Sequence, residues 1–153
     1  MIGKNPEAVD EWGFSNQPAL KDFYLEIVAK TVDACSGLDR YGVLVRAPDT
    51  NKGYVYGFSC DGRYRLYQWD GKNYQAIQEW KASGLITAGP GQTNRLGIWM
   101  KGDTIRLYAN RKLLAEFKDD TYNEGRFGLF IGSGETKDFQ VDVDEVDYWK
   151  LGE

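Results

Sequence analysis

Residues Tyr41–Asp70 read YGVLVRAPDTNKGYVYGFSCDGRYRLYQWD, and this stretch decides the fold. Runs rich in β-branched and aromatic residues follow one another in it, at Tyr41–Ala47, Tyr54–Cys60 and Arg63–Trp69. The dipeptide Asp61-Gly62 between the last two is a strong hairpin signal, because a type I′ turn needs φ > 0 at both central residues. The turn formers of Pro48–Gly53 join the first two runs. We therefore predict a three-stranded antiparallel meander.

Side chains alternate between the two faces of a strand, so the same stretch predicts a core face and an outer face. We expect the core face to carry Val43, Tyr56, Phe58 and Leu66. We expect the outer face to carry Arg46, Tyr67 and Trp69.

Period-2 alternation continues on both sides of the meander. Asp22–Asp33 predicts a half-buried strand, and Arg95–Asn110 predicts a hairpin that turns at Gly102-Asp103. In the last strand Val141 and Val143 have the opposite parity to Val146 and Tyr148, so a one-residue bulge near Asp144-Glu145 is needed to bring all four to the core side. About ten strands and no helix indicate an all-β, antiparallel two-sheet sandwich or a barrel.

The length of 153 residues fits one domain. We expect residues 22–151 to form the sandwich and residues 1–21 to be an irregular N-terminal segment or an edge strand. The chain has 19 Lys and Arg against 23 Asp and Glu, for a net charge of −4, and no long basic run. We therefore expect neither nucleic acid nor an anionic membrane surface as a partner, since both require a positive footprint. No apolar run reaches the roughly 18 residues of a membrane span.

The first twelve residues contain no apolar signal-peptide core. The chain is then either intracellular, or a mature form or excised domain of a larger secreted or surface protein. We expect the second, and hence an extracellular or cell-surface location with possible adjoining domains.

Cys35 and Cys60 are the only cysteines, and each lies at the edge of a predicted strand. A disulfide between them would close a loop of about 25 residues and stabilise the fold by about 3.5 kcal/mol in the chain-entropy model. The alternatives are two unrelated thiols, or a metal or redox role. The chain has no His and no CxxC, so a zinc site or thiol catalysis would lack its usual partners.

Four phrases carry a resemblance to a known family. They are DFYLEIVA, YGVLVRAPDTNKGYVYGFSCDGRYRLY, NRLGIWMKGDTIRLYANRKLLAEF, and RFGLFIGSG followed by VDVDEVDYWKL. Their order between Asp22 and Leu151 resembles the concanavalin A-like jelly rolls, and within them the laminin-G-like and 3-keto-disaccharide-hydrolase-like domains of bacterial extracellular proteins. Two departures are Glu145, where the family usually has Asn, and the short segment before Trp12.

The resemblance implies a two-sheet jelly roll that binds carbohydrate or is attached to a protein that acts on it. It does not imply catalysis, because many members have no known activity. It also implies a possible structural calcium, for which Asp49 with Asn51, or Asp119 with Asp120, supply oxygen ligands. Neither pair approaches a dedicated calcium loop, and acidic turn formers are the alternative interpretation.

Asp142, Asp144 and Asp147 reproduce the carboxylate spacing of glucanases on this fold, which pair a nucleophile with an acid. Both outer positions are Asp rather than Glu, however, and the run lies in the terminal strand, so a solvated strand face is the alternative. The absence of His removes the base of Ser-His and Cys-His catalysis. We expect no catalytic residues, although a glycoside-active enzyme of the laminarinase-like fold stays an alternative.

Outer-face aromatics are the best functional candidates, because sugar rings stack on Trp and Tyr while polar groups hold the hydroxyls. The predicted ligand-binding residues are Trp69, Trp99, Tyr67 and Tyr108, with Arg46 and Glu26 bonding hydroxyls. If their strands share one sheet, these residues form one groove for a polysaccharide or glycan. The prediction is a non-catalytic carbohydrate-binding module. The alternatives are cross-strand packing of the same aromatics, or a structural or protein-interaction sandwich with no small ligand.

Overall fold

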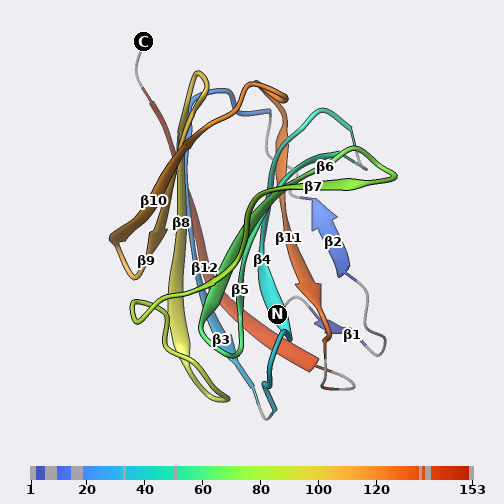
Figure 1. Ribbon diagram of the computed structural model, residues 1–153, viewed down its shortest axis with the longest axis vertical. Helices are drawn as coiled ribbons and strands as arrows, with labels where there is room; N and C mark the ends of the chain where they lie inside the picture. The colour runs from blue at the N-terminus through green and yellow to red at the C-terminus, as the bar shows by residue number, and fades with distance from the viewer. Residues whose placement is uncertain are drawn as a thin grey trace.

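Two antiparallel six-stranded sheets lie side by side as the layers of a sandwich in the computed structural model (Figure 1). The structure describes residues 3–5, 10–14, 19–32, 34–49, 52–134, 136 and 139–151; for 3–5 and 10–14 only the backbone is described. The two-sheet antiparallel prediction is confirmed, and the described residues form twelve strands rather than about ten.

Sheet A has the order β1 (Gly3–Asn5), β12 (Phe139–Lys150), β3 (Phe23–Thr31), β8 (Thr93–Lys101), β9 (Thr104–Ala109), β10 (Lys112–Lys118). Sheet B has the order β2 (Asp10–Phe14), β11 (Arg126–Gly132), β4 (Arg40–Ala47), β5 (Gly53–Ser59), β6 (Arg63–Trp69), β7 (Tyr74–Ala82). The predicted meander is therefore the centre of sheet B, extended by β7.

The hairpin between β5 and β6 forms as predicted, but its turn is not type I′. Gly62 has φ of +85°, whereas Asp61 is not in the positive-φ region. The connection has three residues, Cys60 to Gly62, and its turn is closed by the Gly62 N–H, which donates to the carbonyl of Ser59 at 3.1 Å. The two adjacent residues with positive φ, as type I′ requires, are Asn110 (51°) and Arg111 (68°), between β9 and β10.

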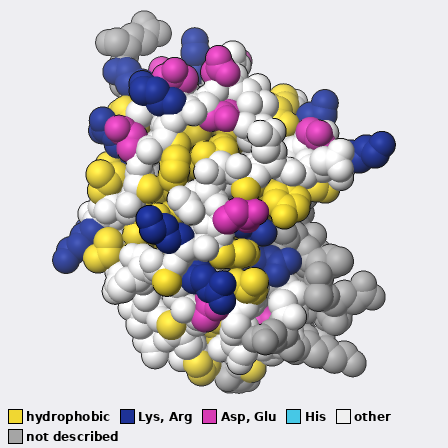
Figure 2. Space-filling model, viewed as in Figure 1, with side chains coloured by type: hydrophobic (Ala, Val, Ile, Leu, Met, Phe, Trp, Pro, Cys, Tyr) yellow, Lys and Arg dark blue, Asp and Glu magenta, His cyan; other side chains and the backbone are white. Residues whose placement is uncertain are grey.

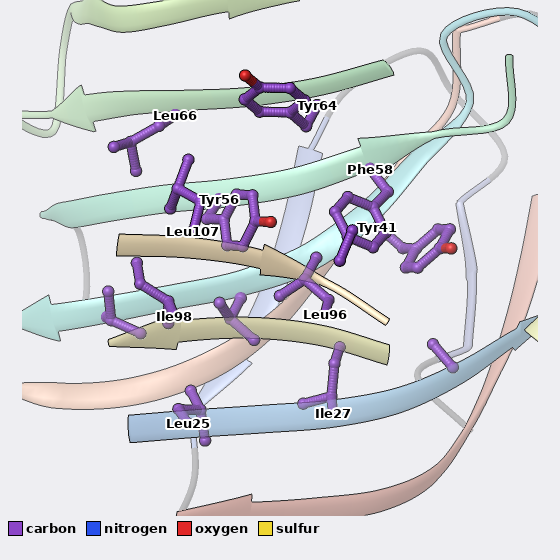
Figure 3. Close-up of a cluster of buried hydrophobic side chains, with 14 of the residues drawn as sticks. Leu25, Ile27, Tyr41, Tyr56, Phe58, Tyr64, Leu66, Leu96, Ile98 and Leu107 are labelled. Carbon is purple, nitrogen blue, oxygen red and sulfur yellow. The ribbon is translucent and has the colours of Figure 1, made fainter. Parts of the chain in front are cut away.

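The core lies between the inner faces of the two sheets (Figure 3). Figure 3 shows Leu25, Ile27, Leu96, Ile98 and Leu107 of sheet A facing Tyr41, Tyr56, Phe58, Tyr64 and Leu66 of sheet B. The predicted core face of the meander is confirmed, since its four named members have no exposed surface: Val43, Tyr56, Phe58 and Leu66. Alternation identified this face because each strand keeps its period of two across the sheet.

The bulge predicted in the last strand is also confirmed. The register of β12 against β3 shifts between Val143 and Glu145. After the shift, Val146 lies opposite Ile27 and Tyr148 opposite Leu25, on the core side. Val146 is nevertheless 40% exposed, whereas Val143 and Tyr148 pack against the core cluster.

Cys35 and Cys60 form a disulfide with a Cα–Cα distance of 5.3 Å. The bond joins the segment after β3 to the β5–β6 turn, and so ties sheet A to sheet B. The disulfide, one of three possibilities that the sequence left open, is therefore confirmed.

Charges of both signs are interspersed on the face seen in Figure 2, with apolar side chains between them. This face offers no large area of one sign of the kind that nucleic acid binding uses. In the described ranges, no helix is long and apolar enough to cross a membrane.

Candidate functional site

The six predicted ligand-binding residues do not share one surface. Tyr67 and Trp69 belong to β6 in sheet B, whereas Trp99 (β8), Tyr108 (β9) and Glu26 (β3) belong to sheet A. The core fills the space between the sheets, so outer-face residues of the two sheets lie on opposite sides of the molecule. The single groove is therefore wrong: alternation tells which face of its own sheet a residue takes, but not which sheet its strand joins.

Arg46 is a buried structural residue and not a surface contact for a ligand. It has φ of 49° beside a register shift between β4 and β11, which takes it out of the alternation of β4. It is 1% exposed. Its guanidinium donates to the carbonyl oxygens of Lys21 (2.6 and 3.0 Å), Gly102 (2.8 Å) and Tyr122 (3.2 Å). Burial lowers the pKa of this guanidinium.

Glu26 does lie on the outer face of sheet A, but its carboxylate is already occupied. It is 3% exposed. Oε2 accepts from Arg95 at 3.1 Å, and Oε1 accepts from the Tyr24 hydroxyl at 3.1 Å and from Arg111 at 3.5 Å. Burial, and then the Glu26 charge, raise the pKa of Tyr24 well above its ordinary value. The carboxylate that was expected to bond sugar hydroxyls is thus already hydrogen-bonded within the protein.

Trp99 and Tyr108 also lie on the outer face of sheet A, where neighbours partly cover them. The guanidinium of Arg106 lies 4.4 Å from the Trp99 ring centroid and is held there by a 2.7 Å ion pair to Glu116. Tyr108 packs edge-on against Tyr24 with centroids 5.7 Å apart. These contacts fit the alternative interpretation, in which the aromatics pack across strands.

On sheet B, the outer face of β6 gathers a cluster of aromatic rings around Arg65. Strict alternation in RYRLYQW puts Arg65, Tyr67 and Trp69 on this face and Tyr64 and Leu66 in the core. The Arg65 guanidinium carbon lies 4.4 Å from the Tyr67 ring centroid, within cation–π distance.

Strand β7 contributes two more rings to this cluster. Trp69 pairs with Tyr74 in the register, and Tyr74 is 54% exposed, with its ring edge-on to Tyr67 at 5.6 Å. Two register shifts follow, so that Glu79 and Trp80 together lie opposite the single residue Arg65. The Arg65 guanidinium carbon is consequently 4.6 Å from the Trp80 centroid and 5.8 Å from the Tyr74 centroid.

A cavity of about 220 Å³ opens beside this cluster. We call this cavity the Arg65 pocket, and it is lined by Arg40, Arg65, Tyr67, Trp69 and Tyr74. Tyr74 also lines a neighbouring hollow of about 140 Å³ formed with Gln68, Asp70, Asn73 and Gln75. The volume of the Arg65 pocket matches a monosaccharide more closely than a drug-sized ligand, because pockets for drug-sized ligands start at about 300 Å³.

The Arg65 pocket lies beside a second apolar cluster on the outer face of sheet B. Tyr67 and Trp69 pack against it, and its other members are Leu44, Ala47, Val55 and Phe130. A Cβ on Gly57 would lie 2.5 Å from the Phe130 ring, which shows that this ring lies directly on the sheet backbone. Tyr67 is 4% exposed, so it is a wall of the pocket, whereas Tyr74 presents its ring to solvent.

Of the pocket residues, the sequence predicted Tyr67 and Trp69 as ligand contacts and placed Arg65 on the outer face. It did not identify Tyr74, Trp80 or Arg40. Tyr74 and Trp80 could not be assigned to a face, because β7 contains register shifts and the irregular pattern of YQAIQEW gives no consistent parity. Arg40 could have been assigned, because it lies three residues before the core residue Val43 in β4, and strict alternation then places it on the outer face.

The geometry gives little support to the carboxylate site predicted in β12 or to the predicted calcium sites. The bulge in β12 separates Asp142 from Asp147, so the three Asp residues do not occupy one regular strand. Asp119 accepts from the Tyr54 hydroxyl and from Gln68, each at 2.5 Å, and from the Thr121 N–H at 3.0 Å. Asn51 lies outside the described residues. Within them, no group of three or more His, Cys, Asp and Glu is placed to hold a metal ion.

A family model described as the 3-keto-alpha-glucoside-1,2-lyase-like domain matches residues 4–144. No protein with a curated description matches the sequence significantly.

Among solved structures, the carbohydrate-binding module CBM66 from Bacillus subtilis is similar, with a TM-score of 0.76 and 19% identity, covering 95% of this chain and 84% of that chain. The galectin LEC-6 from Caenorhabditis elegans has a TM-score of 0.61 and 17% identity, covering 90% and 95%. CG-16, a homodimeric agglutinin from chicken liver, has a TM-score of 0.61 and 11% identity, covering 92% and 100%. At these identities the likeness establishes the jelly-roll fold alone.

Proposed function

The chain belongs to the 3-keto-alpha-glucoside-1,2-lyase-like domain family, and from that premise we propose that it binds carbohydrate at the Arg65 pocket. The family assignment confirms the resemblance stated from the sequence. The observation that carries the proposal is the group of aromatic rings around one guanidinium at a cavity on the outer face of sheet B. Aromatic walls with a few polar groups are the usual construction of a sugar site.

The roles of the pocket residues follow from their exposure and contacts. Tyr74, the most exposed ring, stacks on the apolar face of a sugar ring, and Trp69 forms the adjoining wall. Tyr67 is buried, and its ring packs against the guanidinium of Arg65. Arg65 donates to sugar oxygens, since its guanidinium carries five N–H donors in one plane.

Comparison with related folds supports carbohydrate as the ligand class. CBM66 is a carbohydrate-binding module, and the galectin LEC-6 and the chicken agglutinin share the same sandwich. We propose a binding role without chemistry at this pocket, because no described carboxylate lines it and the chain has no His, the most frequent general acid and base. The disulfide supports an oxidising, extracellular setting.

A glycan array followed by titration calorimetry tests the proposal. Tyr74→Ala is expected to weaken binding about tenfold, which corresponds to the loss of one stacking contact of about 1.4 kcal/mol. Trp69→Ala is expected to act in the same direction. Since Trp69 also packs against the apolar cluster of sheet B, the exposed Tyr74 gives the cleaner result.

Trp99→Ala is the matched control, because Trp99 lies on the outer face of the opposite sheet. It is expected to leave affinity unchanged. Weaker binding by Trp99→Ala together with full binding by Tyr74→Ala would transfer the site to sheet A, where the sequence also placed Trp99 and Tyr108. An array without hits, together with a stable protein partner, would favour the structural sandwich instead.

A further inference from the structure

Arg65 has an unusual environment for a charged side chain. Among the described residues, its Nε is the buried side-chain nitrogen or oxygen that has no hydrogen-bond partner. Rings surround its guanidinium at 4.4 Å (Tyr67), 4.6 Å (Trp80) and 5.8 Å (Tyr74). A buried donor without a partner is unfavourable, and more so when the group is charged, so this environment calls for an explanation.

The other cations that are fully or largely buried, or stacked on rings, have their acceptors inside the protein. Arg46 donates to backbone carbonyls of three segments, and Arg106, which is likewise stacked on a Trp, is paired with Glu116 at 2.7 Å. Arg65 forms no ion pair with any described carboxylate, although Glu79 lies opposite it in the register. The described residues therefore supply neither an acceptor for Nε nor a carboxylate that pairs with this guanidinium.

The charge of the pocket lining decides what kind of acceptor fits. Arg40 and Arg65 both line the cavity, no Asp or Glu among the described residues does, and the remaining described walls are aromatic. The chain as a whole has a net charge of −4, so this cavity is a local exception. Charges of one sign within low-dielectric walls focus the field and attract the opposite charge. A guanidinium also matches a carboxylate in geometry, because two of its N–H groups donate in parallel to the two oxygens.

We propose that the Arg65 pocket selects acidic sugars, namely a hexuronate whose ring stacks on Tyr74 and Trp69 while its carboxylate accepts from Arg65. This inference rests on the proposed function and adds the substrate class. The anion supplies the counter-charge that no described carboxylate of the cavity lining gives this guanidinium. A neutral sugar supplies only hydroxyl acceptors, which form weaker bonds to a cation than a carboxylate does.

The test compares acidic oligosaccharides with their own carboxyl-reduced forms. Oligogalacturonate, oligomannuronate and a glucuronate-containing oligosaccharide are titrated against the full chain, each beside the reduced, neutral counterpart of the same length and linkage. We expect at least one acidic probe to bind ten times more tightly or better than its reduced form. We also expect this difference to shrink with added salt, as the attraction is partly electrostatic.

Variants of Arg65 test whether its guanidinium causes the difference in affinity between the acidic probe and its reduced form. Arg65→Gln is expected to make the acidic probe and its reduced form bind equally, and Arg65→Lys to restore part of the preference through its charge. Arg106→Gln, which removes a ring-stacked Arg on sheet A, is the matched control and is expected to retain the full preference. Thermal unfolding of each variant shows that the fold is intact.

The outcomes separate this inference from the proposed function. Equal binding of acidic and neutral probes, still weakened by Tyr74→Ala, would overturn the acidic preference and leave the carbohydrate site standing. A sulfated oligosaccharide bound in preference to every uronate would overturn the carboxylate assignment. Absence of binding to any sugar would overturn both.

Discussion

The guanidinium of Arg46 donates a 2.8 Å hydrogen bond to the carbonyl oxygen of Gly102, 56 residues further along the chain. Arg46 lies at the end of β4 in sheet B, and Gly102 lies in the turn between β8 and β9 of sheet A. Through its further bonds to Lys21 and Tyr122, one side chain fixes three segments at once. A residue that the sequence presented as a ligand contact is therefore part of the framework.

Arg46→Met is expected to lower the free energy of unfolding by about 3–5 kcal/mol, because the apolar side chain leaves several buried carbonyl oxygens without a donor. Urea unfolding followed by Trp fluorescence measures the change. Arg106→Met is the control; Arg106 is an exposed residue of a surface ion pair, and its loss should move the urea midpoint very little. A stable Arg46→Met protein with lost glycan binding would contradict the structural role.

Gly57→Ala is expected to destabilise the protein by about 1–3 kcal/mol through overpacking. The added Cβ would lie 2.5 Å from the Phe130 ring and 2.9 Å from the carbonyl oxygen of Tyr41, so either the ring or β4 must move. Gly84→Ala is the matched control, since no heavy atom lies within 4 Å of its Cβ position. Thermal unfolding should separate the two variants, and equal midpoints would show that the Phe130 ring is free to shift.

Removal of the disulfide by the double change Cys35→Ala and Cys60→Ala is expected to cost about 3.5 kcal/mol, the value for a loop of about 25 residues. The wild type should lose the same amount of stability when a reductant is added. The double variant should be insensitive to the reductant. A reductant effect on the double variant would mean that the thiols are not its target.

Asp119 is expected to contribute to the dependence of stability on pH. Burial alone would raise the pKa of its carboxyl group, but hydrogen bonds from Tyr54, Thr121 and Gln68 outweigh burial and hold the pKa below its ordinary value. The folded state thus binds fewer protons than the unfolded state between the two pKa values. The contribution is complete above about pH 4, the unfolded pKa, and is lost as the pH falls through the lower folded pKa.

Comparison of wild type with Asp119→Asn isolates this contribution, because the other carboxylates are common to both proteins. The variant should be less stable at pH 7, and the difference in urea midpoint should narrow as the pH falls from about 4 toward 2. A difference that stays constant over this range would show that the ionised form of Asp119 is not the stabilising one.

The sequence by itself determined most of the strands, and the two faces of those strands that alternate regularly. Local physics is sufficient for both, because turn chemistry at Asp61-Gly62 or Asn110-Arg111 acts over a few residues and the period of two assigns Tyr56 inward and Tyr67 outward without knowledge of the partner strand. The bulge of β12 also followed, since Val143 and Val146 could not otherwise share a face. The turn type at Asp61-Gly62 did not follow, because the connection between β5 and β6 has three residues, whereas a type I′ hairpin turn has two.

Only the tertiary structure decided which strands became neighbours, and this decided the candidate site. Trp69 and Trp99 have the same outward parity, yet sheet pairing sends them to opposite sides of the molecule. The shifts in β7 bring Trp80 beside Arg65, and the bulge at Arg46 turns that side chain inward, although neither irregularity has a clear local signal. A shift of one residue exchanges the two faces of a strand, so the contents of a surface depend on register, which long-range packing sets.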